Sequence, residues 1–435
     1  MTTTFTTEAG GSLRGELRVP GDKSISHRSV MLGALAEGRT TITGFLDGED
    51  CLATIAAFQA MGVAIEHPQP NVVIIDGVGL HGLRSPAAPL DMGNSGTAMR
   101  LLCGVLAGQS FDSTLLGDPS LSRRPMRRVT EPLSRMGARI ETAEDGTPPL
   151  RIIGGQVLHG QQHHLTVASA QVKSALLLAG LWGEGETCVT EPAPTRDHTE
   201  RMLRGFGYEV RQQGRTACVT GGGRLEGSEV DVPADISSAA FFLVGASIAR
   251  GSDLLLRHVG MNPTRTGVID ILRLMGAAIE VIDRREIGGE PVADLHVRWA
   301  PLHGIRIPSE LVPLAIDEFP VLFVAAACAE GETVLTGAEE LRVKESDRIQ
   351  VMADGLSSLG VRCEVQPDGM RIRGRAMLDG GEVESHGDHR IAMAFALAAL
   401  RADGPIIVHD CDNVATSFPH FAELARGVGL GVTAT

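Results

Sequence analysis

The stretch "LRLMGAAIEVI", residues 272–282, carries the pattern that decides the fold. Its first residues have the apolar spacing of a helix, Gly276 then ends the helix, and a strand-like run follows. Five further stretches repeat this pattern: "FQAMGVAIE" (58–66), "LSRMGARIE" (133–141), "LRGFGYEV" (203–210), "LSSLGVRCEV" (356–365) and "ARGVGLGV" (425–432). Successive glycines stand 69 to 84 residues apart, and this regular recurrence predicts six copies of one structural unit.

A second shared pattern lies upstream of each glycine. Strand-like stretches such as "EGRTTITGF" (37–45) and "EGETVLTGA" (330–338) follow helices rich in Ala and Leu. Each copy is therefore expected to run strand, helix, strand, strand, helix, strand, which is a βαββαβ repeat. Six such repeats predict an α/β protein with two domains of three repeats each.

The division between the two domains is expected near "VDVPADISS" (230–238), where Pro233 is a candidate hinge. A second crossing is expected near Pro20, so that the first twenty residues supply strands to the C-terminal domain. The predicted domains are residues 21–235, and residues 1–20 together with 236–435.

The composition is typical of a soluble globular protein, with 43% hydrophobic and 21% charged residues in a chain of 435. The longest apolar runs, such as "VLFVAAACA" (321–329), are too short to span a membrane, and the N-terminus lacks the features of a signal peptide. The seven cysteines are scattered without a C-x-x-C pair, which argues against a zinc site and fits a reducing compartment. These features predict a cytoplasmic protein without a membrane partner.

The formal net charge of −14 argues against a nucleic-acid partner, because such proteins normally have a basic excess or patch. An acidic protein can still bind a small anion where its cations are concentrated. The segment "PGDKSISHR" (20–28) has the composition of a phosphate-binding loop. Because Asp22 separates Gly21 from Lys23, however, the segment does not have the spacing of a nucleotide-binding P-loop.

Several cations stand at the starts of the expected helices, where a positive charge opposes the helix dipole. Those in a first helical turn are Lys23, Arg28, Arg100 and Arg390, and those in loops after the mid-repeat strands are Arg124, Arg196, Lys344 and Arg348. The same loops hold two carboxylates that can exchange protons, Asp317 and Glu345. The pattern predicts a site for small anions, and the alternative is a set of solvated surface ion pairs.

Six motifs in this order resemble the 5-enolpyruvylshikimate-3-phosphate synthase family. They are "PGDKSISHR" (20–28), "GNSGTAMR" (93–100), "RRPMRRV" (123–129), "SAQVKSALLLAGL" (169–181), "LRVKESDR" (341–348) and "GDHRIAM" (387–393). The likeness covers essentially the whole chain, and "RDHTE" (196–200) and "NPTR" (262–265) resemble the second, bacterial class of that family.

The resemblance implies the enolpyruvyl transferase fold, two inside-out α/β domains of three βαββαβ repeats that close over a cleft holding the active site. It also implies transfer of the enolpyruvyl group of phosphoenolpyruvate to the 5-hydroxyl of shikimate 3-phosphate, with release of phosphate, on the shikimate pathway to aromatic amino acids. By the same resemblance we expect a monomer that needs neither a metal nor an organic cofactor.

The resemblance also implies roles for individual residues, carried over motif by motif. Those expected at shikimate 3-phosphate are Lys23, Ser24, Arg28, Ser169, Ala170, Gln171, Arg196, Asp317 and Lys344. Those expected at phosphoenolpyruvate are Lys23, Asn94, Gly96, Arg124, Gln171, Glu345, Arg348 and Arg390. Lys23, Asp317 and Glu345 are the expected catalytic residues: Asp317 accepts the 5-hydroxyl proton, and Glu345 helps to protonate the methylene carbon.

Two other functions are open to the same pattern. The related transferase acting on UDP-N-acetylglucosamine uses a cysteine in the loop that reads "LSRRPMRR" (121–128) here, and this loop has none. A repeat protein that only binds a phosphorylated metabolite would not need Asp317 and Glu345 beside the cations. In the resembled family the herbicide glyphosate competes for the phosphoenolpyruvate site, and tolerant members of the second class often have an alanine at the position of Gly96.

Overall fold

The computed structural model describes residues 2–435, and its contacts divide the chain into two compact units. The first unit consists of residues 21–232 and 287–290. The second unit consists of the chain up to Pro20, residues 233–286 and residues 291–435. The chain therefore leaves the second unit after Pro20 and returns to it at Pro233.

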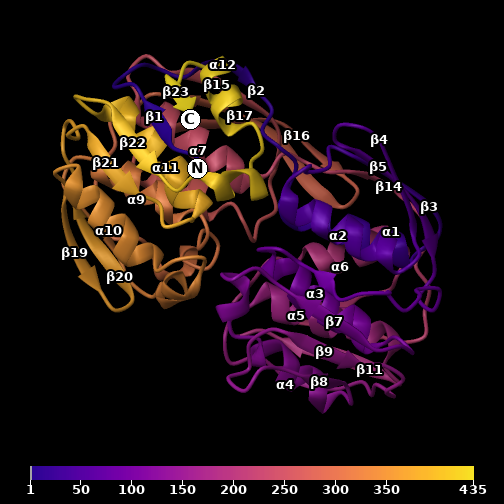
Figure 1. Ribbon diagram of the computed structural model, residues 1–435. Coiled ribbons are helices and arrows are strands. Elements are labelled where there is room, and N and C mark those ends of the chain that lie inside the picture. Colours follow the sequence, from indigo (N-terminus) through magenta and orange to yellow (C-terminus); the bar gives the residue numbers. More distant parts are fainter. Residues whose placement is uncertain (1) are drawn as a thin grey trace. The chain divides into compact units, whose positions relative to one another are not determined.

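The first unit contains three four-stranded sheets and six α-helices (Figure 1). The first sheet consists, in order, of β14 (Glu229–Asp231), β3 (Glu37–Thr43), β5 (Val72–Val78) and β4 (Ala64–Gln69). The second consists of β6 (Leu90–Asp91), β7 (Ser113–Leu116), β9 (Leu150–Ile153) and β8 (Arg139–Glu141). The third consists of β10 (Gln162–His164), β11 (Glu186–Thr190), β13 (Thr216–Thr220) and β12 (Arg211–Gln213). The helices are α1 (Lys23–Leu35), α2 (Glu49–Ala60), α3 (Gly96–Ala107), α4 (Arg127–Arg135), α5 (Ala170–Ala179) and α6 (His198–Gly205).

The second unit contains two four-stranded sheets, one three-stranded sheet and six α-helices. One four-stranded sheet consists, in order, of β16 (Ala278–Ile287), β17 (Glu290–Arg298), β15 (Asp253–Gly260) and β2 (Arg14–Leu17). The three-stranded sheet consists of β18 (Glu332–Leu335), β20 (Gly369–Arg373) and β19 (Arg362–Gln366). The other four-stranded sheet consists of β21 (Gly381–Glu384), β22 (Ile406–His409), β1 (Phe5–Thr7) and β23 (Val432–Ala434). The helices are α7 (Ile236–Ile248), α8 (Gly267–Leu274), α9 (Phe319–Ala327), α10 (Arg348–Ser358), α11 (His389–Ala398) and α12 (Phe421–Gly427).

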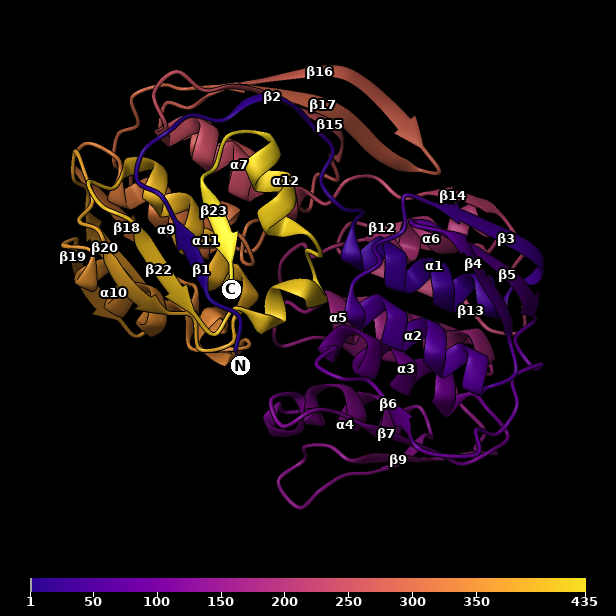
Figure 2. The same ribbon diagram turned by 45° about the horizontal axis from the view of Figure 1, so that its top comes forward.

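The six sheets share one plan, in which a parallel pair is extended by two antiparallel strands. In the third repeat of the first unit, for example, β10 runs parallel to β11, which pairs antiparallel with β13, and β13 pairs antiparallel with β12. In the three-stranded sheet, an isolated parallel bridge between Arg306 and Val334 stands where the fourth strand would pair. The strands β1 and β2 complete two sheets of the second unit, which brings the N-terminal and C-terminal segments side by side (Figures 1 and 2).

The α/β fold class is confirmed, but the order of elements within a repeat differs from the expected βαββαβ. The observed order is strand, helix, strand, helix, strand, strand, as in β10, α5, β11, α6, β12 and β13. Only a short loop joins the middle strand to the second helix, and the two remaining strands follow that helix as a hairpin. The predicted order places two adjacent strands between the helices, whereas the observed hairpin, with its turn at Asn71 between β4 and β5, follows the second helix.

The glycines that end the six helical stretches all have the left-handed backbone conformation predicted for them. Their φ angles lie between 77° and 109°, a range that residues with a Cβ rarely adopt. They are Gly62, Gly137, Gly207, Gly276, Gly360 and Gly429. The repeat predicted from "LRLMGAAIEVI" is therefore a repeat of backbone conformation as well as of sequence.

Three helices in each unit are buried on almost every side, with the sheets outside them (Figure 2). We call α1, α3, α5, α7, α9 and α11 the inner helices. Every residue of α7 and α9 is buried, because Ala, Val, Leu and Phe occupy all faces of these helices. The inner helices approach one another closely, and a Cβ added to Gly104 of α3 would lie 2.1 Å from the carbonyl oxygen of Ala175 on α5.

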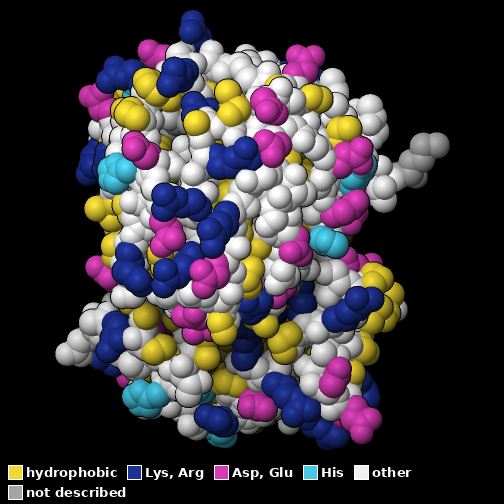
Figure 3. All heavy atoms as spheres, turned by 90° about the vertical axis from the view of Figure 1, so that its left-hand side faces the viewer, with side chains coloured by type: hydrophobic (Ala, Val, Ile, Leu, Met, Phe, Trp, Pro, Cys, Tyr) yellow, Lys and Arg dark blue, Asp and Glu magenta, His cyan; other side chains and the backbone are white. Residues whose placement is uncertain are grey.

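The surface of the molecule has mixed charge on the face drawn in Figure 3, where Lys and Arg side chains lie among Asp and Glu. None of the helices within residues 2–435 has both the length and the apolar character required to cross a bilayer. Two of the seven cysteines, Cys188 and Cys218, are joined by a disulfide bond, a pairing that their scattered spacing did not predict.

The close approach of α3 and α5 gives a test of the packing. We expect Gly104→Ala to destabilise the protein by about 1–3 kcal/mol, since the new methyl group meets backbone rather than a side chain that can move. Thermal unfolding should show a Tm lowered by about 2–4 °C for each kcal/mol. The control is Gly427→Ala in the exposed end of α12, where a Cβ has nothing within 4 Å and the Tm should be unchanged. Equal Tm values for the two variants would contradict this packing.

Candidate functional site

The inner helices of the first unit each begin with a polar side chain that caps the helix. Asp22 accepts a hydrogen bond from the Ile25 amide, Ser95 from the Ala98 amide and Ser169 from the Val172 amide. The predicted site residues follow these caps directly: Lys23 and Ser24 start α1, Gly96 starts α3, and Ala170 and Gln171 start α5. The helix starts therefore expose polar groups next to the positive ends of three helix dipoles.

Side chains link these helix starts to one another. Gln171 donates from Nε2 to Thr97 Oγ1 over 2.9 Å, and it accepts at Oε1 from Arg100 Nη1 over 2.7 Å. His27 on α1 lies with its Nε2 3.4 Å from Ser95 Oγ, the cap of α3. The starts of α1, α3 and α5 thus form one group of side chains within the first unit.

Arg124 joins this group from the loop before α4. Its Nη2 donates to Asn94 Oδ1 over 2.6 Å, and Asn94 in turn donates from Nδ2 to Asp118 over 2.7 Å. A Cβ added to Gly96 would lie 2.8 Å from Arg100 Nη1 and 3.2 Å from Arg124 Nη1. Because Gly96 has no side chain, the space next to the guanidinium groups of Arg100 and Arg124 stays open.

Arg28 is buried, and its guanidinium donates to three groups of the protein. Nε donates to Thr199 Oγ1 over 2.7 Å, Nη2 to Ser174 Oγ over 2.8 Å, and Nη1 to the Ser24 carbonyl over 2.9 Å. The pKa of Arg28 is lowered to about 10, chiefly by burial; the charges of Glu200 and Asp22 act to raise this pKa, and the charge of Arg196 acts to lower it. Arg28 ties α1 to α5 and α6, and its contact with a substrate stays a prediction.

Lys23 forms an ion pair with Asp50 of α2. Next to it His27 is fully buried, with Nδ1 2.8 Å from Thr54 Oγ1. Burial lowers the pKa of His27 well below its usual value, and the positive charges of Lys23 and Arg28 lower this pKa further. His27 is therefore neutral at neutral pH and adds no positive charge to the group.

The second unit gathers the other five predicted residues. Lys344 Nζ lies 3.4 Å from Asp317 Oδ1, and Arg348 Nη1 lies 3.5 Å from the same oxygen. Arg348 also donates from Nη2 to Glu345 over 2.6 Å, and Arg390 donates from Nη1 to the Asp317 carbonyl over 2.9 Å. Asp317, Lys344, Glu345, Arg348 and Arg390 thus form a single cluster, which we call the carboxylate–cation cluster.

Arg348 is the buried centre of this cluster, with 1% of its side chain exposed. Its Nε donates over 2.8 Å to Asp388, whose side chain also caps α11. Burial alone would lower the pKa of Arg348, but the carboxylates of Asp388, Glu345 and Asp317 outweigh burial and raise it. The guanidinium is therefore permanently charged, and it holds the two predicted catalytic carboxylates in place.

Sequence reasoning missed the groups that hold the site residues. These are Asp50, His27, Asp118 and Asp388, together with Glu318, whose Oε1 lies 3.8 Å from Arg390. Their only signal was a polar residue next to a helix start, which is the ordinary pattern of an N-cap. Arg196 lies in the loop between β11 and α6, where its charge acts on Arg28.

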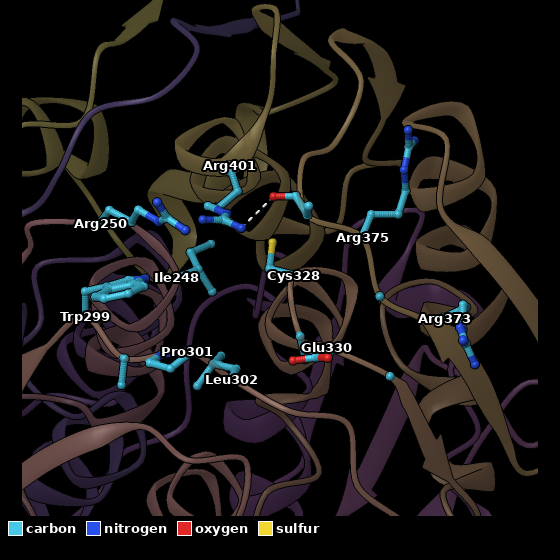
Figure 4. A pocket seen from close by; sticks show the side chains of 15 residues that line it. Ile248, Arg250, Trp299, Pro301, Leu302, Cys328, Glu330, Arg373, Arg375 and Arg401 are labelled. Carbon is cyan, nitrogen blue, oxygen red and sulfur yellow. Dashed lines mark hydrogen bonds between the residues drawn. The ribbon is translucent and has the colours of Figure 1, made fainter.

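A separate pocket of about 440 Å³ lies in the second unit and contains none of the predicted site residues (Figure 4). Arg250 lies over the Trp299 ring at 5.4 Å, and Arg401 donates to the Ala376 carbonyl over 2.5 Å. The two arginines that are drawn on the right of the view, Arg373 and Arg375, extend away from Trp299. The pocket is thus not part of the residue groups described above.

Known proteins resemble this chain over nearly its whole length. A family model for EPSP synthase (3-phosphoshikimate 1-carboxyvinyltransferase) matches residues 7–424. The 3-phosphoshikimate 1-carboxyvinyltransferase of Alkalilimnicola ehrlichii is 72% identical, over 99% of this chain and 96% of the relative. That of Methylococcus capsulatus is 69% identical, over 98% of both chains.

The solved structures agree with the sequence comparison. The structure of EPSP synthase from Acinetobacter baumannii is 58% identical in sequence, covers 100% of both chains and has a TM-score of 0.91. Identity and structural similarity at this level over the full length show that the fold is shared. The chain belongs to the EPSP synthase family, the 3-phosphoshikimate 1-carboxyvinyltransferases.

Proposed function

We propose that this chain transfers the enolpyruvyl group of phosphoenolpyruvate to the 5-hydroxyl of shikimate 3-phosphate and releases phosphate. The observation that carries the proposal is the carboxylate–cation cluster, in which Asp317 lies within 3.5 Å of both Lys344 and Arg348. A carboxylate among cations can take a proton from a substrate that the same cations hold by its negative charges.

The first unit is proposed to supply most of the shikimate 3-phosphate contacts. Lys23 and Ser24 stand at the start of α1, where backbone amides and the helix dipole favour a phosphate. Ser169, Ala170 and Gln171 stand at the start of α5 and offer hydroxyl, amide and carboxamide groups for the hydroxyls of the ring. Further contacts are assigned to Arg28 and Arg196 of this unit, and to Asp317 and Lys344 of the second unit.

Phosphoenolpyruvate is proposed to bind to Arg124, Arg348 and Arg390. Arginine matches both carboxylate and phosphate with paired hydrogen bonds, and phosphoenolpyruvate carries one of each. Lys23, Asn94, Gly96, Gln171 and Glu345 are assigned to the same ligand. Residues of both units thus serve one reaction. We propose that the chain forms two three-repeat domains, one of residues 21–235 and the other of residues 1–20 together with residues 236–435.

The reaction follows from these assignments. Asp317 accepts the proton of the 5-hydroxyl as that oxygen bonds to C2 of phosphoenolpyruvate, and C3 gains a proton with the help of Glu345. The bond from C2 to the phosphate oxygen then breaks, C3 loses a proton, and the enol ether and phosphate leave. The cations offset the repulsion between the two anionic substrates, and holding both in contact turns a bimolecular step into a unimolecular one.

The related transfer to UDP-N-acetylglucosamine has less support. The loop at residues 121–128 contains no cysteine, and the relatives at 69–72% identity carry the shikimate enzyme's name. A protein that only binds a phosphorylated metabolite would release no phosphate. We further propose that the chain acts in the cytoplasm as a monomer, without metal or organic cofactor, so that a chelator should not change its rate.

The test is an assay of phosphate release from phosphoenolpyruvate. We expect release only when shikimate 3-phosphate is also present, with and without chelator. Release that depends on UDP-N-acetylglucosamine instead would establish the related transferase, and no release with either acceptor would favour a binding protein.

Asp317→Asn should bind both substrates and react slowly, because the amide keeps the shape of the side chain but cannot accept the proton. Loss of a general base typically costs about 10²–10⁴-fold in kcat. Steady-state kinetics should show this loss with KM values changed far less. The matched control is Asp270→Asn on the exposed side of α8, which should keep wild-type kcat. A near-normal kcat for Asp317→Asn would mean that another group is the base.

Arg124→Ala should weaken phosphoenolpyruvate binding, because it removes charged hydrogen bonds worth about 1.5–3 kcal/mol each. That loss corresponds to a rise of roughly tenfold or more in the KM for phosphoenolpyruvate. The neighbouring Arg123 is exposed, so Arg123→Ala is the control and should leave this KM unchanged. If both variants have the wild-type KM, Arg124 does not hold this substrate.

Gly96→Ala should raise the inhibition constant of glyphosate more than the KM for phosphoenolpyruvate. The added Cβ lies 2.8 Å from Arg100 Nη1 and 3.2 Å from Arg124 Nη1, so it narrows the space beside both guanidinium groups. The longer inhibitor should be affected more than the shorter substrate. We expect the wild-type enzyme to be inhibited, and inhibition assays on both proteins measure the two constants. An enzyme indifferent to glyphosate before and after the substitution would exclude this steric explanation.

A further inference from the structure

The disulfide between Cys188 and Cys218 lies on the outer face of a sheet rather than in the core. The two residues are direct partners in the antiparallel pair β11 and β13, with their Cα atoms 4.1 Å apart. Side chains alternate along a strand, and Val189 next to Cys188 and Val219 next to Cys218 both belong to the core of the first unit. The sulfur atoms therefore point to the opposite, outer face.

Two charged side chains cover the bond. Arg211 of the edge strand β12 has its Nη2 3.8 Å from Cys188 Sγ and 3.4 Å from Cys218 Sγ. The same nitrogen donates to both carboxylate oxygens of Glu186, over 2.7 and 2.8 Å. Cys188 and Cys218 are only 2% and 3% exposed, whereas the side chains of Arg211 and Glu186 are 54% and 37% exposed. The cover is thus a solvated ion pair that can move away without disturbing the core.

Glu186, Cys188 and Cys218 also lie close enough together to be considered as ligands of a metal ion. The bond between the two sulfurs and the guanidinium beside them oppose this role, because a cation would meet a positive charge and no thiolate. The same guanidinium stabilises a cysteine that leaves as a thiolate in thiol–disulfide exchange, whereas the Glu186 carboxylate, whose Oε2 lies 3.4 Å from Cys188 Sγ, destabilises it.

We propose that Cys188 and Cys218 form a reversible thiol–disulfide site that exchanges with low-molecular-weight thiols such as glutathione. The thiolate of one glutathione attacks a sulfur of the bond, which gives a mixed disulfide and releases the other cysteine as a thiolate that takes a proton. A second glutathione thiolate attacks the mixed disulfide. This step releases the remaining cysteine and oxidised glutathione, so that two electrons pass from two glutathione molecules to the protein.

The bond closes the loop from Cys188 to Cys218, and this loop contains α6 and Arg196. Within it, Thr199 accepts the hydrogen bond of Arg28, and Glu200 lies 2.7 Å from the ammonium group of buried Lys173. A cross-link limits the freedom of such a loop in the unfolded chain. The redox state of the pair therefore changes the stability of the segment that holds Arg28.

The experiment uses the full-length wild-type chain in buffers of reduced and oxidised glutathione, with alkylation of free thiols and mass spectrometry of the peptides. We expect Cys188 and Cys218 to be protected in the oxidised buffer, alkylated after reduction and protected again on reoxidation. The other cysteines, which are Cys51, Cys103, Cys328, Cys363 and Cys411, should stay thiols in both buffers. The reduced protein should unfold at a Tm lower by about 5 °C or more.

Two single variants test the role of the ion pair. Arg211→Gln should slow the reduction by glutathione, and Glu186→Gln should speed it, each by about two- to fivefold, as one partly exposed charge allows. Free thiols at both positions in the oxidised buffer, or a bond that glutathione cannot reduce in the folded protein, would overturn the proposal. A change of rate in the same direction for both variants would overturn the assigned role of Arg211.

Discussion

Positive charge buried at the starts of helices is the constraint on which the rest of this structure depends. A helix start already favours anions, so a lysine or arginine there adds repulsion that other groups must offset. In the second unit, Asp388, Glu345 and Asp317 surround Arg348 and raise its pKa. In the first unit, Lys23 pairs with Asp50, and Arg28 donates only to uncharged oxygens, which leaves the lowered pKa that burial imposes. Bound anions would complete the balance in the first unit.

The inside-out arrangement makes this concentration of charge possible. The inner helices are buried along their length, so Ala, Leu, Val and Phe occupy their faces and polar groups collect at their starts. Close approaches such as Gly104 against Ala175 set α3 beside α5, and this contact places Gln171 within reach of Thr97 and Arg100. Side chains on the outer face of a sheet do not pack against the core. The ion pair of Arg211 and Glu186, which covers Cys188 and Cys218, lies on such a face.

The sequence predicted the repeat because the helix-ending glycines report a local backbone conformation, and all six have the expected positive φ. It predicted the order of elements less well: Pro70 and Asn71 mark a turn between β4 and β5, but strand-like runs alone do not show whether a hairpin lies between the two helices of a repeat or after the second one. The roles of Asp317 and Glu345 came from the family resemblance, and their contacts with Arg348 depend on elements far apart in the chain. Asp388 was indistinguishable from an ordinary cap, and the 30-residue separation of Cys188 and Cys218 carries no pattern.

The most direct test of this account is a calorimetric titration with shikimate 3-phosphate and with shikimate, which lacks the phosphate, at several salt concentrations. If the cations at the helix starts bind anionic substrates, the phosphate should lower the Kd by about 100-fold or more, as expected for two charged hydrogen bonds. The Kd of shikimate 3-phosphate should also rise with salt, because salt screens the exposed part of this attraction. Equal Kd values for the two ligands, independent of salt, would contradict the account.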